Sequence, residues 1–115
     1  MLELTVDELK RHIQAEDYEA ITGGDDEITE TFIDNGREAV KAVLAGYGVE
    51  FDESDAVLRL AIIKASLSEL YAYSADWVTA EKYKDEASKI LRPLAPSSLP
   101  SSALVKGSNS WKGFS

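Results

Sequence analysis

The amino-acid sequence predicts an all-α protein, a small bundle of about four helices followed by an extended C-terminal tail. Two observations lead to this prediction. Apolar residues recur at spacings of three and four through most of residues 5–94, which is typical of helices with one buried face. From residue 95 onward, serine, proline and glycine replace that pattern. We therefore expect a helical domain over residues 1–94 and a tail over residues 95–115.

The first two helices are expected to be short. Thr5 and Glu8 form the S/T-x-x-E capping box, in which each side chain accepts a hydrogen bond from a free backbone N–H at the helix start. A second helical segment is expected over residues 16–21. It ends at Gly23 and Gly24, because glycine readily adopts the left-handed conformation common at helix ends.

A long third helix is expected from Asp25, its N-cap, to about Ala45. Gly36 lies on the apolar stripe of this helix, where glycine costs about 1 kcal/mol relative to alanine. We interpret Gly36 as a place where another backbone comes close. The other residues of the stripe recur at helical spacing: Ile28, Phe32, Ala39, Val40, Val43 and Tyr47.

The remaining face of the third helix is acidic. Four acids recur at spacings of four and therefore share one face: Asp26, Glu30, Asp34 and Glu38. The chain has a net charge of −9, and residues 1–55 hold 16 acids against 4 bases. Two interpretations are open. The face is either an ordinary solvated surface or one that lines or borders a DNA channel without binding DNA, because acids repel phosphates.

The fourth helix is expected over residues 56–74, with Asp52 or Ser54 as its N-cap. It is apolar on most of its circumference, which is typical of a helix buried on several sides. We therefore expect it to be the central helix of the bundle. Its expected core residues are Leu60, Ile63 and Leu67.

The last helix is expected from Trp77 or Thr79 to Arg92, and Pro93 ends it because proline lacks the backbone N–H. Its apolar stripe, in which we expect Ile90 to be buried, comprises Ala80, Tyr83, Ala87, Ile90, Leu91 and Leu94. Aromatic residues gather where the last two helices meet: Tyr71, Tyr73, Trp77 and Tyr83. They indicate either core packing or a subunit interface, where tyrosine and tryptophan are enriched.

No constellation of residues indicates catalysis or cofactor binding. The chain has no cysteine and one histidine, His12, which excludes thiolate sites and multi-histidine metal sites. The acids from Asp25 to Glu30 do not follow the calcium-loop spacing, and no glycine-rich phosphate loop occurs. Neither a signal peptide nor a run of roughly 20 apolar residues is visible. We expect a protein that is not an enzyme, holds no cofactor or metal, and has no membrane partner.

The tail carries a small set of residues suited to binding a partner. Residues 95–103 are too small and polar to pack a core, and residues 95–115 contain two lysines and no acid. Aromatic side chains on a flexible arm are common anchors in grooves of a partner. The expected partner-binding residues are Leu104, Val105, Lys106, Trp111, Lys112 and Phe114. The alternative is a segment without a native role, such as a cloning remnant.

Four segments resemble the phage head–tail connector proteins of the Mu-like and lambdoid type, also called head-completion or adaptor proteins. The resemblance covers about residues 3–94. It rests on the opening LTVDELKRHI, the second long helix FIDNGREAVKAVLAGYG, the apolar helix SDAVLRLAIIKASLSELYAY and the closing helix EKYKDEASKILRPL. Residues 48–52 stand where the family usually has a proline-rich loop.

The resemblance implies a structural protein of the virion neck, assembled in the host cytoplasm. Such a protein forms a homo-oligomeric ring, typically a dodecamer, between the portal protein and a tail or stopper protein. DNA passes through the ring without specific binding. Two other classes stay open: an acidic DNA-mimic protein, and a small helical regulatory protein that binds a partner protein.

Overall fold

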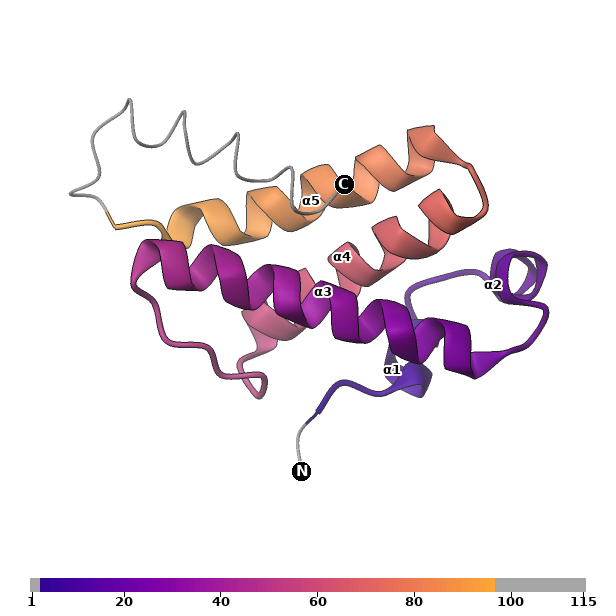
Figure 1. The fold of residues 1–115 in the computed structure, drawn as a ribbon, viewed down its shortest axis with the longest axis horizontal. Helices are drawn as coiled ribbons and strands as arrows, with labels where there is room; N and C mark the ends of the chain where they lie inside the picture. Colours follow the sequence, from indigo (N-terminus) through magenta and orange to yellow (C-terminus); the bar gives the residue numbers. More distant parts are fainter. Residues whose placement is uncertain (1–2, 97–115) are drawn as a thin grey trace.

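The computed structural model describes residues 3–96, and within this range the chain is all-helical. The predicted fold class is confirmed. The three long helices lie alongside one another and α2 lies at the end where α3 begins (Figure 1). The elements in order are α1 (Val6–Lys10), α2 (Ala15–Thr22), α3 (Asp26–Tyr47), α4 (Ala56–Tyr73), α5 (Trp77–Leu91) and the 3₁₀ turn η1 (Arg92–Leu94).

Helix α4 is the central helix, as predicted, because it packs against both α3 and α5. Ile63 and Leu67 are buried, as expected. The prediction that Leu60 is buried is wrong, since 36% of its surface is exposed. In the first turn of α4 only Leu58 is buried, whereas most residues from Ala61 to Tyr71 are buried. Leu60 therefore lies where the neighbouring helices no longer cover α4.

The core-facing line of α3 is displaced from the predicted stripe. Most predicted stripe residues are partly buried and flank the line, whereas Thr29 is fully buried although it is polar. The Thr29 hydroxyl lies 2.7 Å from the Tyr18 hydroxyl of α2, which offsets the cost of burying it. The residues that face the core are Thr29, Ile33, Gly36, Val40 and Leu44.

Gly36 marks the close approach of α3 to α4, as predicted. A Cβ atom added to Gly36 would lie 2.7 Å from the Ser66 Oγ and 3.2 Å from the Ile62 carbonyl oxygen. Ser66 is itself small and fully buried, and its hydroxyl donates to that carbonyl over 2.7 Å. The two helices therefore cross where each presents a small residue.

The N-caps of the first and third helices are as predicted. The Thr5 Oγ1 accepts from the Glu8 N–H over 3.2 Å, and Asp25 Oδ1 accepts from the Glu27 N–H over 3.0 Å. The capping box at Thr5 is formed from one side only, because the Glu8 carboxylate accepts instead from the Arg59 guanidinium of α4. This ion pair joins α1 to the central helix.

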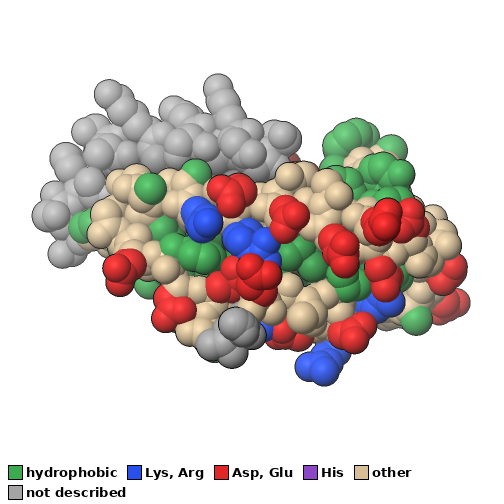
Figure 2. All heavy atoms as spheres, turned by 60° about the horizontal axis from the view of Figure 1, so that its bottom comes forward, with side chains coloured by type: hydrophobic (Ala, Val, Ile, Leu, Met, Phe, Trp, Pro, Cys, Tyr) green, Lys and Arg blue, Asp and Glu red, His purple; other side chains and the backbone are tan. Residues whose placement is uncertain are grey.

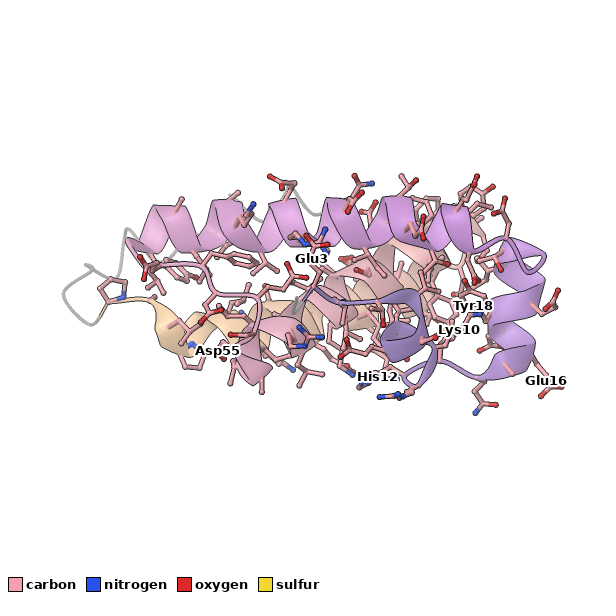
Figure 3. All side chains as sticks on the ribbon, turned by 90° about the horizontal axis from the view of Figure 1, so that it is seen from below. Glu3, Lys10, His12, Glu16, Tyr18 and Asp55 are labelled. Atoms are coloured by element: carbon pink, nitrogen blue, oxygen red, sulfur yellow. The ribbon has the colours of Figure 1, made fainter. Side chains whose placement is uncertain are left out.

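The predicted cap of α4 is wrong. Asp55 caps the helix, with its Oδ1 2.8 Å from the Val57 nitrogen, and Figure 3 shows it at the helix start. Asp52 forms a turn with Ser54, accepting from its N–H over 3.0 Å and its hydroxyl over 2.6 Å. Three candidate caps stand close together in this loop, and Asp55 serves because it directly precedes the first helical residue.

Helix α5 begins at Trp77, one of its two predicted starts, and is capped by Asp76 through the Thr79 N–H over 3.1 Å. Ile90 is partly rather than fully buried. The helix gives way to the 3₁₀ turn containing Pro93, which ends at Leu94, the last residue of the predicted helical domain.

Candidate functional site

The four acids predicted to share a face do so on the outer side of α3, and all four are exposed. Figure 2 shows acidic side chains spread over the face of the molecule that includes α3, with a few basic side chains among them. The sequence pattern therefore located this surface, which we call the α3 acidic face: Asp26, Glu30, Asp34 and Glu38.

Basic side chains reduce the negative charge of the α3 acidic face. Asp26 lies 3.1 Å from the Lys10 ammonium, and Asp34 lies 2.7 Å from the Arg37 guanidinium. Glu38 lies 3.5 Å from the Lys41 ammonium. The sequence pattern shows the acids but does not show that three of them have a cation beside them.

Asp26 differs from the other three acids because it has a structural role. Its carboxylate accepts from the Tyr18 hydroxyl over 2.7 Å, and Lys10 lies over the Tyr18 ring, 4.9 Å from the centroid. Figure 3 shows Lys10 and Tyr18 beside one another. The hydrogen bonds from Tyr18 and from Lys10 hold the pKa of Asp26 below its usual value. Asp26 thus connects α1, α2 and α3.

A second polar cluster lies mostly beneath the surface, where Arg37 of α3 meets Glu53 and the backbone of Leu4. The Arg37 Nε and Nη2 donate to the two carboxylate oxygens of Glu53 over 2.6 and 3.0 Å, and the Leu4 N–H donates to Glu53 over 2.7 Å. Both side chains are largely buried, with 14% and 12% of their surfaces exposed. The cluster joins the N-terminal segment, α3 and the loop before α4.

The charge of Glu53 is maintained despite its burial. Burial alone raises the pKa of the Glu53 carboxyl, but the hydrogen bonds from Arg37 and from the Leu4 N–H outweigh this effect and hold it below its usual value. The sequence does not reveal this pair, because Arg37 and Glu53 are 16 positions apart on different elements and no local pattern connects them.

The four aromatic residues at the junction of α4 and α5 divide into two pairs. Tyr71 is buried and stacks on the partly buried Tyr83, with ring centroids 5.6 Å apart, so this pair packs against the core. Tyr73 and Trp77 are 57% and 67% exposed. The structure thus shows core packing for one pair, and the exposed pair is left as the candidate for an interaction surface.

The large hydrophobic side chains that are exposed in residues 3–96 form two groups. The turn patch lies where α4 is joined to α5 and consists of Tyr73, Trp77 and Val78. The start patch lies in the first turns of α4 and consists of Val57 and Leu60. Figure 2 shows hydrophobic side chains protruding at upper right, the end at which Figure 1 shows the α4–α5 turn.

The turn patch is held by a strained backbone and a neighbouring ring. Ala75 has a φ of +65°, the left-handed region that alanine rarely adopts. The Phe32 ring of α3 contacts the Tyr73 ring edge to face, with centroids 5.5 Å apart. The contact with Phe32 therefore fixes the position of the Tyr73 ring at this turn.

The described part of the chain contains no group of three or more potential metal ligands, and none of its helices is long and apolar enough to cross a membrane. His12 is exposed just after α1 (Figure 3). The predicted partner-binding residues of the tail lie outside the described residues: Leu104, Val105, Lys106, Trp111, Lys112 and Phe114.

Comparison of the chain with protein-family models, with curated proteins and with solved structures finds no match. Interpretation of the surfaces therefore depends on their own chemistry and on the sequence resemblance.

Proposed function

We propose that this chain is a subunit of a phage or prophage head–tail connector, a ring that joins the portal protein to a tail or stopper protein and through which DNA passes. The observation that carries the proposal is the exposed α3 acidic face on an all-α body. The four segments that resemble the connector family also correspond to α1, α3, α4 and α5, which supports the same interpretation.

An acidic helix face suits the wall of a DNA channel. Carboxylates repel the phosphate backbone, so DNA slides past them without binding, whereas a basic wall would grip it. The bases Arg37 and Lys41 among the acids moderate the repulsion without reversing it, since the exposed Glu27 adds to the four acids of this face. The face is one that DNA passes without adhering.

The same ion pairs make a DNA mimic the weaker candidate. A mimic presents acids as substitutes for phosphates, and a basic side chain beside an acid weakens that likeness. Asp34 and Glu38 each lie within 4 Å of a cation on the same helix. A small regulatory protein has no observation of its own in its favour.

The proposal assigns the tail to assembly. Residues 95–115 form an arm that binds the portal or a neighbouring subunit, with Trp111 and Phe114 as its apolar anchors. The proposal includes no catalysis and no cofactor, and it locates the protein in the virion neck. Deleting residues 101–115 should leave the melting temperature nearly unchanged and abolish assembly onto the portal.

The decisive experiment is assembly with the portal protein encoded by the same phage or prophage. The expected result is a ring of this chain on the portal, seen by negative-stain electron microscopy of the purified complex. A chain that neither binds the portal nor forms rings contradicts the proposal. If truncation at residue 100 leaves assembly normal, the role of the tail is contradicted while the ring is not.

The α3 acidic face is tested separately by neutralisation. Asp26 is left intact because it has a structural role, so the variant is Glu30→Gln, Asp34→Asn, Glu38→Gln. The matched control neutralises three exposed acids elsewhere: Glu16→Gln, Glu50→Gln and Glu81→Gln. We expect the first variant to fold and assemble but to reduce infectivity, and the control to match the parent. Equal infectivity of both variants indicates an ordinary solvated face.

A further inference from the structure

We propose that copies of this chain associate head to tail, with the turn patch of one copy packed against the start patch of the next. The inference rests on the proposed function for the closing of the ring, and it names the surfaces through which the ring forms. Its partner is a second copy of this chain.

The two patches point to different neighbours. Val57 and Tyr73 stand at opposite ends of α4, roughly 24 Å apart at the helical rise of 1.5 Å per residue. At about 3.6 residues per turn, Val57 and Tyr73 also point to nearly opposite sides of α4, so one flat contact surface cannot cover both. Each copy needs one neighbour for the turn patch and another for the start patch.

A head-to-tail contact covers both patches in every interior copy. A two-fold symmetric contact either pairs one patch with itself and leaves the other in water, or pairs the turn patch with the start patch twice, which requires both patches on one side of the molecule. A heterologous contact uses the two different surfaces together and repeats from copy to copy until the ring closes. Closure covers both patches in every subunit, which is the arrangement that exposes least apolar surface.

The charge distribution favours the same side of the molecule for contact between copies. Residues 1–55 hold 16 acids against 4 bases, so two copies repel one another through α1, α2 and α3. Residues 56–94 hold 5 acids against 6 bases, and this near-neutral half carries both patches. Identical acidic chains can therefore approach closely through α4 and α5 with little electrostatic cost.

The turn patch has the composition of an interface centre. Tryptophan and tyrosine are enriched among residues that dominate binding energy, and Tyr73 is already positioned by Phe32. Val78 is 83% exposed beside them, which gives it no role in the monomer core. Stable interfaces bury about 1,200–2,000 Å² in total, of which these five side chains supply only the centre. We therefore expect weak, concentration-dependent association in solution.

The experiment uses one variant for each patch. Val78→Glu introduces a charge into the turn patch, and Val57→Glu introduces one into the start patch. Both positions are exposed and lie in the first turn of a helix. An acid there is compatible with the helix dipole, so we expect both variants to retain the fold. Ala42→Glu, at an exposed position on α3, controls for the added charge. Circular dichroism and melting curves verify folding.

Molar mass as a function of concentration, from sedimentation velocity of the full chain, gives the result. The parent and Ala42→Glu should associate, and each patch variant alone should associate at least tenfold more weakly. An equimolar mixture of Val78→Glu and Val57→Glu should form dimers and stop there, because it contains one intact patch of each kind. This mixed dimer, together with growth of the parent beyond a dimer, is specific to a head-to-tail contact, because a two-fold contact stops at the dimer in the parent as well.

Several outcomes overturn the inference. A parent that stays monomeric up to about 1 mM lacks the contact. A Val57→Glu variant that associates like the parent indicates a symmetric contact of turn patches. If both variants form normal rings on the portal, the proposed function stands and this interface is wrong. If the parent associates head to tail but ignores the portal, the interface stands and the connector proposal fails.

Discussion

The N-terminal part of the described chain and the α4–α5 pair are stabilised by different interactions. Residues 3–55 carry a network of polar contacts, among them the Arg37–Glu53 pair and the Tyr18–Asp26 hydrogen bond, in addition to the apolar packing of α3 on α4. The α4–α5 pair is held mainly by apolar packing around Leu67 and Leu91, both fully buried. The first region should therefore respond to pH, and the second to changes in side-chain volume.

The largest expected effect is a cavity in the apolar region. Leu67→Ala removes a fully buried side chain at the centre of α4 and should lower the free energy of unfolding by about 2–5 kcal/mol. Urea denaturation measures the loss. Leu60→Ala is the control on the same helix, and its cost should be much smaller because Leu60 is partly exposed. Equal losses would contradict the assignment of the core.

The next effect belongs to the polar region. Glu53→Gln replaces a carboxylate that accepts from Arg37 and from the Leu4 N–H, so it should lower the free energy of unfolding by about 1.5–3 kcal/mol at pH 7. Hydrogen exchange should show the N-terminal segment opening first, because the glutamine side chain keeps only one acceptor oxygen for the Arg37 and Leu4 donors. Glu50→Gln, at an exposed position in the same loop, should have little effect.

The pH dependence tests the same carboxylate. The pKa of Glu53 is lower in the folded protein than its usual value of 4.5, so the unfolded chain binds the proton more readily. The stabilisation is fully present above about pH 4.5 and is lost as the pH falls through the pKa of the folded state. Urea denaturation between pH 7 and 3 should show a shallower loss for Glu53→Gln than for the parent. Parallel curves would exclude this linkage.

The contact between the two regions at Gly36 gives a smaller effect. Gly36→Ala places a methyl group 2.7 Å from the Ser66 Oγ, and the displacement should cost about 1–3 kcal/mol, less the gain in helix propensity. Adding Ser66→Ala should recover part of the loss, so the two substitutions should not be additive when measured by thermal unfolding. Additive losses would show that the two helices do not meet at this point.

The features that could be predicted from sequence are those with local signals. The caps at Thr5 and Asp25, the glycine at the helix crossing and the identity of the central helix all depend on residues within a few positions of one another. Arg37–Glu53 and the burial of Thr29 depend on partners from other elements. The position of the α4 cap was missed because Asp52, Ser54 and Asp55 are all chemically suitable.

The candidate surfaces also divide into features with a local sequence signal and features that depend on partners from other elements. The α3 acidic face was predicted, because a spacing of four places its acids on one side of a helix. The cation Lys10 beside Asp26 was not, because it comes from another helix. The aromatic set at the α4–α5 junction was recognised, but its division into a packed and an exposed pair depends on how α5 packs on α4. Exposure of Leu60 likewise depends on where neighbouring helices end.

The smallest expected effect on stability concerns the turn that carries the exposed aromatic residues. Ala75 has a positive φ, which costs alanine roughly 1–2 kcal/mol and glycine almost nothing. Glycine loses more conformational entropy on folding, so Ala75→Gly should raise the free energy of unfolding by only about 0.5–1 kcal/mol. Ala72→Gly, within the last turns of α4, is the matched control and should lower the free energy of unfolding by about 1 kcal/mol.

Glycine at position 75 also widens the range of conformations open to the turn, so Tyr73 and Trp77 should be held less firmly relative to one another. Ala75→Gly should therefore melt at a higher temperature and yet self-associate more weakly in sedimentation velocity. Such opposite changes are expected where backbone strain supports a binding surface. A variant that gains stability and associates as strongly as the parent would show that the strain at Ala75 does not serve the turn patch.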